Sequence, residues 1–263
     1  MCLLLVAIDA APGLPLLVLG NRDEFHGRDS AAAARWDEDK RVVGGRDLVA
    51  GGSWLALRND GRFAAVTNLR TGVPATAPKS RGALVRNFLL GEATPVVYLD
   101  LLRTQLADYG PFNLVVGNRD GVYALGSSEG LMRPLRRGVH VISNGALGVH
   151  WPKTERLQRR FGELVRSGHV NDEASVLDLL LDETQPADEE LPDTGVGLDL
   201  ERRLAPVFIR GERYGTRAGS LLVRHHDGSV ALRERRFGPN GQAQGEDRWA
   251  ALANAAFEQT AAF

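Results

Sequence analysis

The chain begins with the stretch MCLLLVAIDAAPGLPLLVLGNRDE at residues 1–24, and this stretch decides the fold. It contains two apolar runs, residues 2–8 and 16–19, which are separated by the turn Pro12-Gly13-Leu14-Pro15. Two short apolar runs around such a turn predict a hairpin of buried strands. The second run changes abruptly into the charged string Asn21-Arg22-Asp23-Glu24, so polar side chains are expected at the end of this hairpin.

The remaining chain alternates between groups of strands and groups of helices. Strands are predicted at residues 51–57, 62–68, 112–116, 121–124, 139–143, 207–209, 220–223 and 230–234. Helices are predicted from Ser80, as N-cap, to residue 89, at residues 94–108, 153–165 and 173–181, and in a short Ala-rich tail after residue 245. Residues 182–198 are acidic and are expected to be mobile. Strand hairpins followed by helices and further hairpins indicate an α+β fold.

The composition excludes several classes of protein. The 263 residues can bury a large core and are predicted to form a single domain over residues 1–263. A formal charge of −1 argues against a nucleic-acid partner, and the absence of Cys/His spacings and of Gly-rich phosphate loops predicts no metal and no cofactor. The apolar start lacks a basic segment, is interrupted by Asp9 and is too short for a membrane span, so a cytoplasmic location is predicted.

Cys2 is the only cysteine, and removal of Met1 would make it the N-terminal residue. It would then carry a nucleophilic thiol and a free α-amine, which titrates at a pKa of about 7.7–8.0 and can act as the adjacent general base. The alternative interpretation is that Cys2 is a small apolar residue at the start of a buried strand.

Polar residues follow several predicted strands in an informative order. Arg22 can stabilise a thiolate and Asp23 can hold an ammonium group, both just after the second apolar run. Asn68 ends the strand after the Asn-Asp-Gly turn, and an asparagine amide is a standard oxyanion donor. Asn144 follows another strand, and Arg217 precedes a late apolar one. Taken singly, each is an ordinary strand-end or turn residue; together they predict a site.

The chain resembles the NRDE family, whose members include proteins like transport and Golgi organisation protein 2. The resemblance runs from residue 1 to about residue 225 and is carried by the ordered motifs Asn21-Arg22-Asp23-Glu24, Gly51-Gly52-Ser53-Trp54-Leu55-Ala56, Thr67-Asn68-Leu69-Arg70, Ser80-Arg81-Gly82, Phe112-Asn113-Leu114-Val115-Val116-Gly117, Ser143-Asn144, Trp151-Pro152-Lys153 and Tyr214-Gly215-Thr216-Arg217.

The same landmarks resemble the N-terminal nucleophile hydrolases of the cholylglycine hydrolase and penicillin V acylase type. This resemblance implies a four-layer αββα sandwich and a cytoplasmic amidohydrolase or acyltransferase acting on a linear amide of a small molecule. It implies a catalytic set composed of Cys2, Arg22, Asp23, Asn68, Asn144 and Arg217.

One departure concerns Arg22 and Asp23. In the hydrolases the corresponding Arg and Asp are separated by two residues, whereas here they are adjacent and would point to opposite faces of a regular strand. Both can face Cys2 only if the strand bulges or ends there. A second register instead places Asn21 and Glu24 at the site.

The NRDE resemblance also implies a competing function, because members have been linked to haem trafficking and to lipid or acyl-CoA metabolism. The alternative is therefore a non-catalytic carrier that holds haem or an acyl chain in the same cleft. His26 could then ligate haem iron, or Cys2 could do so as an axial thiolate. If the chain is a hydrolase of this architecture, the loops that choose its acyl group would include residues 25–50, 71–80 and 182–205.

Overall fold

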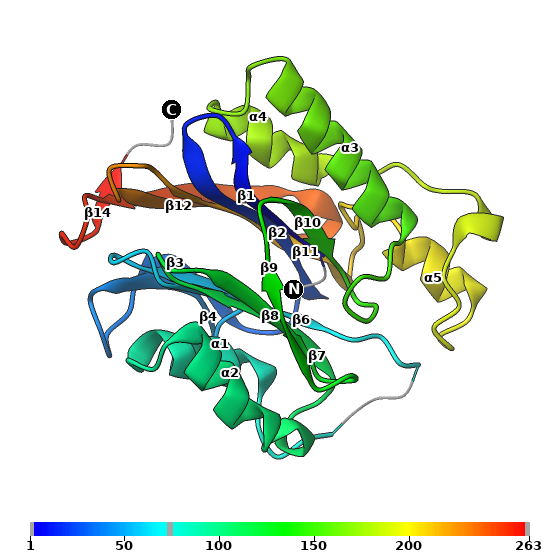
Figure 1. Ribbon diagram of the computed structural model, residues 1–263. Helices are drawn as coiled ribbons and strands as arrows, with labels where there is room; N and C mark the ends of the chain where they lie inside the picture. The colour runs from blue at the N-terminus through cyan, green and yellow to red at the C-terminus, as the bar shows by residue number, and fades with distance from the viewer. Residues whose placement is uncertain (1–2, 73–75, 261–263) are drawn as a thin grey trace.

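The computed structural model describes residues 3–72 and 76–260, so the predicted nucleophile Cys2 lies outside the described residues. Two antiparallel sheets of seven strands each lie face to face between two layers of helices (Figure 1). The expected four-layer αββα sandwich is confirmed. No helix in the described ranges is long and apolar enough to cross a membrane.

The first sheet contains both strands of the N-terminal hairpin. Its strand order is β10-β1-β2-β11-β12-β13-β14. The strands are β1 (Leu3–Ala11), β2 (Leu14–Phe25), β10 (Gly138–Ile142), β11 (Tyr214–Arg224), β12 (Val230–Phe237), β13 (Ala243–Ala251) and β14 (Glu258–Thr260). The predicted hairpin is confirmed, with Leu5 paired to Leu19 and Leu3 paired to Asn21.

The second sheet is a continuous meander in the order β3-β4-β5-β6-β7-β8-β9. The strands are β3 (Ser30–Arg35), β4 (Val42–Asp47), β5 (Leu55–Arg58), β6 (Phe63–Asn68), β7 (Phe112–Gly117), β8 (Val122–Gly126) and β9 (Leu131–Leu135). Residues 25–50, expected as a loop, therefore contain two strands. The run Ala31 to Ala34 has neither β-branched nor aromatic residues, so its strand depends on pairing with β4 rather than on propensity.

The unbroken apolar run of β1 follows from burial on both faces of the sheet. Leu4 and Val6 belong to the core between the two sheets, while Leu3 and Leu5 pack in the core beneath the helices. Successive side chains point to opposite faces of a strand, so a strand covered on both sides must be apolar at every position.

One pair of helices covers the outer face of each sheet. Helices α1 (Arg81–Leu90) and α2 (Pro95–Arg103) lie on the second sheet, and α3 (Pro152–Arg166) and α4 (Glu173–Asp178) lie on the first (Figure 1). The short α5 (Leu198–Leu204) follows the acidic segment. The predicted cap of α1 is confirmed, since the Ser80 side chain accepts a hydrogen bond from the Gly82 N–H at 3.2 Å.

Two predicted elements are wrong. The Ala-rich tail forms strands β13 and β14 instead of a helix, because β13 pairs along β12 from Val230 to Phe237 and this ladder outweighs the helix propensity of alanine. Residues 207–209 are buried but form no strand. Their backbone groups bond elsewhere: the Val207 carbonyl accepts from Asn21, and the Ile209 N–H donates to the Thr216 hydroxyl.

Candidate active site

A cleft of about 490 Å³ lies where β2 and β6 end, and three of the predicted site residues line it. These are Arg22 and Asp23 from β2 and Asn68 from β6. Leu3, the first described residue, pairs with Asn21 at the same end of the first sheet. We refer to this cavity as the Asn68 cleft.

Arg22 and Asp23 both line the Asn68 cleft although they are adjacent in the strand. The register of β11 shifts between Thr216 and Ala218, directly opposite them, and this irregularity relaxes the strict alternation of faces. Asp23 is buried and accepts a hydrogen bond of 2.6 Å from the Thr216 hydroxyl. The alternation of side chains along β2 therefore does not prevent Arg22 and Asp23 from lining the same cleft.

The second register, with Asn21 and Glu24 at the site, fits the structure less well. Asn21 points away from the cleft, because its amide donates to the carbonyls of Leu180 at 3.1 Å and Val207 at 2.8 Å. Glu24 does line the cleft, but one oxygen accepts from the backbone N–H of Phe25 at 2.8 Å.

Arg22 is held by an aromatic ring. Its guanidinium carbon lies 4.5 Å from the centre of the Trp54 ring, and the side chain of Arg22 is buried. Burial lowers the pKa of Arg22, and the nearby Glu24 carboxylate opposes that effect. A Cβ at Gly45 would lie 2.2 Å from the Trp54 indole, so a glycine is needed there for the ring to reach its place. Trp54 is thus a site residue whose role the sequence did not indicate.

Asn68 is oriented by Asn144. The Asn144 amide nitrogen donates to the side-chain oxygen of Asn68 at 3.1 Å and to its backbone oxygen at 2.9 Å. With the Asn68 oxygen engaged in this way, its amide nitrogen is the group that can donate to a ligand. Asn144 itself does not line the cleft and is connected to it by these hydrogen bonds to Asn68.

A buried polar network joins the two sheets beside Asn68. The Thr67 hydroxyl donates to the Ser143 carbonyl at 2.9 Å, and the Asn113 amide donates to the carbonyls of Ser143 at 3.2 Å and Gly145 at 2.8 Å. These bonds hold the end of β6 against the end of β10. Asn113 was not predicted as a site residue, although it is a polar residue within an apolar strand and belongs to one of the motifs of the NRDE resemblance.

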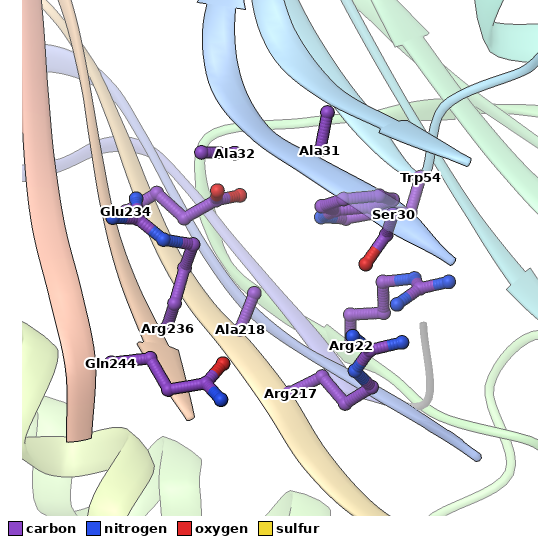
Figure 2. Close-up of a pocket in the computed structure, with 10 residues that line it drawn as sticks. All are labelled: Arg22, Ser30, Ala31, Ala32, Trp54, Arg217, Ala218, Glu234, Arg236 and Gln244. Carbon is purple, nitrogen blue, oxygen red and sulfur yellow. The ribbon is translucent and has the colours of Figure 1, made fainter. Parts of the chain in front are cut away.

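Arg217 lies on the far side of Arg22 and lines a second cavity of about 430 Å³ between the sheets. Its guanidinium donates to the backbone carbonyls of Phe25, the last residue of β2, and of Arg28 beyond it. Figure 2 shows this cavity, which is also lined by Arg22, Trp54 and Glu234. We refer to it as the Glu234 pocket. Of the predicted residues, Asp23 and Asn68 line the Asn68 cleft, Arg217 lines the Glu234 pocket and Arg22 lines both. The two cavities also share Trp54.

His26 does not line either of these cavities. Its Nε2 atom is buried and has no hydrogen-bond partner among the described residues. Burial lowers the pKa of His26, and the neighbouring Arg217 lowers it further. An axial haem ligand must present its nitrogen to an open cavity, so the position of His26 does not suit that role. No group of three or more His, Cys, Asp or Glu in the described ranges is arranged to hold a metal ion.

Glu234 is a buried acid on β12. Its carboxylate accepts from the Ala33 N–H at 2.9 Å and from the Ser220 hydroxyl at 3.3 Å, and the side chain is 1% exposed. Burial raises the pKa of Glu234 from 4.5 to about 7. Sequence reasoning missed Glu234, because nothing near it in the chain indicates that the opposite sheet covers it.

We expect Glu234→Gln to remove a pH-dependent loss of stability. The folded protein holds the Glu234 proton more tightly than the unfolded chain does, so stability falls as pH rises from about 4.5 to about 7. Between pH 5 and pH 8 this loss should be about 2–3 kcal/mol, and the variant should not show it. Urea unfolding at both pH values measures the difference, with the exposed Glu189→Gln as control. An unchanged pH dependence in Glu234→Gln would contradict the assignment.

The comparisons with known proteins agree with this architecture. The sequence profile of the family described as Transport and Golgi organisation 2 matches residues 1–239. The chain is 26% identical to the Transport and Golgi organization 2 homolog of Mus musculus and 27% identical to that of Homo sapiens. Each identity is counted over 255 residues. Each match covers 89% of this chain and 92% of the relative.

Two solved structures have a similar fold. One is the Caenorhabditis elegans N-acylethanolamine-hydrolyzing acid amidase ortholog, with a TM-score of 0.52 and 16% identity over 84% of this chain and 92% of that chain. The other is the C2A mutant of the conjugated bile acid hydrolase from Clostridium perfringens, with a TM-score of 0.51 and 8% identity over 100% of this chain and 97% of that chain. The fold is thus that of N-terminal nucleophile hydrolases, and by its sequence the chain belongs to the Transport and Golgi organisation 2 family.

Proposed function

We propose that this protein is an N-terminal cysteine amidohydrolase or acyltransferase that acts on a linear amide of a small molecule. The observation that carries the proposal is the Asn68 cleft, where Arg22, Asp23 and an oriented Asn68 amide meet at the end of the first hairpin. The fold it shares with an acid amidase and a bile acid hydrolase supports the same class of reaction. His26 gives no support to the haem-carrier alternative, since it lies outside both cavities.

The proposed reaction begins with the removal of Met1, which frees the α-amine of Cys2. This amine takes the thiol proton, and the thiolate attacks the amide carbonyl carbon. Arg22 favours the thiolate by its charge, and Asp23 stabilises the ammonium group that results. The Asn68 amide nitrogen donates to the oxyanion of the tetrahedral intermediate.

Collapse of the intermediate breaks the C–N bond. The ammonium group returns its proton to the departing amine, and a thioester between the acyl group and Cys2 remains. Water then attacks the thioester and the free acid leaves, or a second nucleophile takes the acyl group. The same groups serve this step, with the α-amine as general base.

The test uses the fact that Cys2 is the only cysteine. Intact-mass analysis should show that the purified full chain lacks Met1. Iodoacetamide should label it rapidly at pH 6, where an ordinary thiol with a pKa of about 8.5 is almost wholly protonated. Cys2→Ala provides the blank, and Arg22→Gln should slow the labelling because the thiolate loses its neighbouring charge.

Retention of Met1 would overturn the free-amine mechanism. Labelling at pH 6 no faster than that of free cysteine would overturn the activated thiol. Arg46→Gln is the matched control for the arginine, because Arg46 stacks on Trp36 at the same 4.5 Å but does not line either cavity.

A further inference from the structure

The Glu234 pocket contains more positive charge than its own side chains neutralise. Among the described residues, neither Arg22 nor Arg217 forms an ion pair with a carboxylate. Arg22 contacts the Trp54 ring, and Arg217 bonds only to backbone carbonyls. Arg236, the third arginine of the lining, is paired with Asp247. Two buried or half-buried guanidinium groups therefore have no carboxylate within ion-pair distance in the described part of the chain, and Glu24, whose charge acts on Arg22, is paired with Arg28.

The two arginines also lie close to each other. Arg22 is opposite Ala218 in the sheet, next to Arg217 in the sequence, and the charge of Arg217 contributes to the lowered pKa of Arg22. Like charges that are brought together in a buried place cost free energy unless an anion joins them. This arrangement is typical of a site that is completed by a bound anion.

Further unpaired donors border the same place. The Nε of Arg217 and the indole nitrogen of Trp54 are both buried and lack a hydrogen-bond partner among the described residues. Buried donors are rarely left unsatisfied. Figure 2 shows Arg22, Arg217 and Trp54 together on one side of the cavity, with Glu234 on the other. In the described ranges, no acceptor is therefore available to these two donors.

The dimensions of the pocket suit part of a small substrate. Its volume of about 430 Å³ lies within the range of ligand sites, and it meets the Asn68 cleft at Arg22 and Trp54. A ligand that occupied both cavities would pass these two residues. The lining beyond them includes Ala31, Ala32 and Ala218, which leave room, and the polar end of Gln244.

We propose that the Glu234 pocket binds a carboxylate on the substrate, held by Arg22, Arg217 and the Trp54 indole N–H. This inference rests on the proposed function and narrows it to amides that carry a carboxylate. A carboxylate suits the pocket better than a phosphate, because a second negative charge would face the Glu234 side chain across the cavity.

Binding can be measured without turnover. The full chain carrying Cys2→Ala is titrated by calorimetry at pH 6 with glutarate, with uncharged glutaramide and with inorganic phosphate. At pH 6 Glu234 is protonated, since burial raises its pKa to about 7, and it does not oppose the anion, so glutarate should bind more tightly than uncharged glutaramide. The glutarate and phosphate titrations are repeated at pH 8, where Glu234 is ionised and phosphate carries its second negative charge, and glutarate should bind more tightly than phosphate there.

Variants then locate the site. In the same background Arg217→Gln should weaken glutarate binding about 10- to 100-fold, as expected for one charge-assisted hydrogen-bonded contact. Trp54→Phe keeps an aromatic ring under Arg22 and removes the donor, and it should weaken binding less. The controls are Arg46→Gln and Trp36→Phe, which alter the equivalent stacked pair outside the pocket. Thermal melts verify that each variant is folded.

The outcomes are distinct from those of the nucleophile test. Absence of glutarate binding, or equal weakening by Arg217→Gln and Arg46→Gln, overturns the carboxylate site even if Cys2 is reactive. Tighter binding of phosphate than of glutarate at pH 8 overturns the choice of carboxylate. Glutarate binding that depends on Arg217 supports the site whether or not Cys2 proves to be the nucleophile.

Discussion

Replacing Cys2 with alanine is expected to lower the proposed amide-hydrolysing activity by at least about 10⁴-fold. Loss of a catalytic nucleophile removes the covalent route altogether, and the oxyanion donor and substrate binding then provide only residual catalysis. Because Cys2 is the only cysteine, no other thiol can replace it. Activity is measured with chromogenic anilides, one series with neutral acyl groups and one with carboxylate-bearing acyl groups.

Cys2→Ser provides a graded comparison, since its hydroxyl is a weaker nucleophile at the same position. It should retain a small part of the activity and should accumulate an ester in place of a thioester. Cys2→Ala with the activity of the wild type would contradict a catalytic role for the thiol. If only the neutral anilides were cleaved, Cys2 would still be the nucleophile, but the carboxylate site would be contradicted.

Asn68→Ala is expected to lower kcat by about 10²–10³-fold, equivalent to about 3–4 kcal/mol of transition-state stabilisation. The Asn68 amide nitrogen would donate to the oxyanion, a charge that exists only after attack, so KM should change little. Steady-state kinetics with the best anilide measure both constants. A large rise in KM with an unchanged kcat would instead assign Asn68 to ground-state binding.

Asn144→Ala should give a smaller loss of kcat, because Asn68 would keep its donor but lose the two bonds that orient it. The smaller loss would identify Asn144 as a positioning residue, in contrast to Asn68, which would touch the reacting atoms. Asn118→Ala is the matched control, since Asn118 bonds to Asp120 in the turn between β7 and β8. Equal losses in Asn144→Ala and Asn118→Ala would show that the effect is not specific to the cleft.

Strand prediction succeeded where burial and pattern agreed. The apolar hairpin of β1 and β2 was found because a strand covered on both faces has apolar residues throughout. The tail after residue 245 was assigned to a helix because alanine favours helices, yet its pairing with β12 is a contact with a distant strand that propensity does not report. Residues 207–209 are apolar for packing, while their backbone groups bond to the Asn21 and Thr216 side chains and to the backbone of Asp182 and Thr216.

By itself the sequence was enough to predict the layered α+β fold and to single out Arg22, Asp23, Asn68, Asn144 and Arg217, because polar residues at the edges of apolar strands stand out along the chain. Only the tertiary structure decided how these residues are divided. It places Asn68 in one cavity and Arg217 in another, with Arg22 between them, and it adds Trp54 and Glu234. The physical reason is that each cavity is lined by strands of both sheets. Which side chains face it depends on the register shift in β11 and on the packing of one sheet against the other, and neither is a property of any local stretch of sequence.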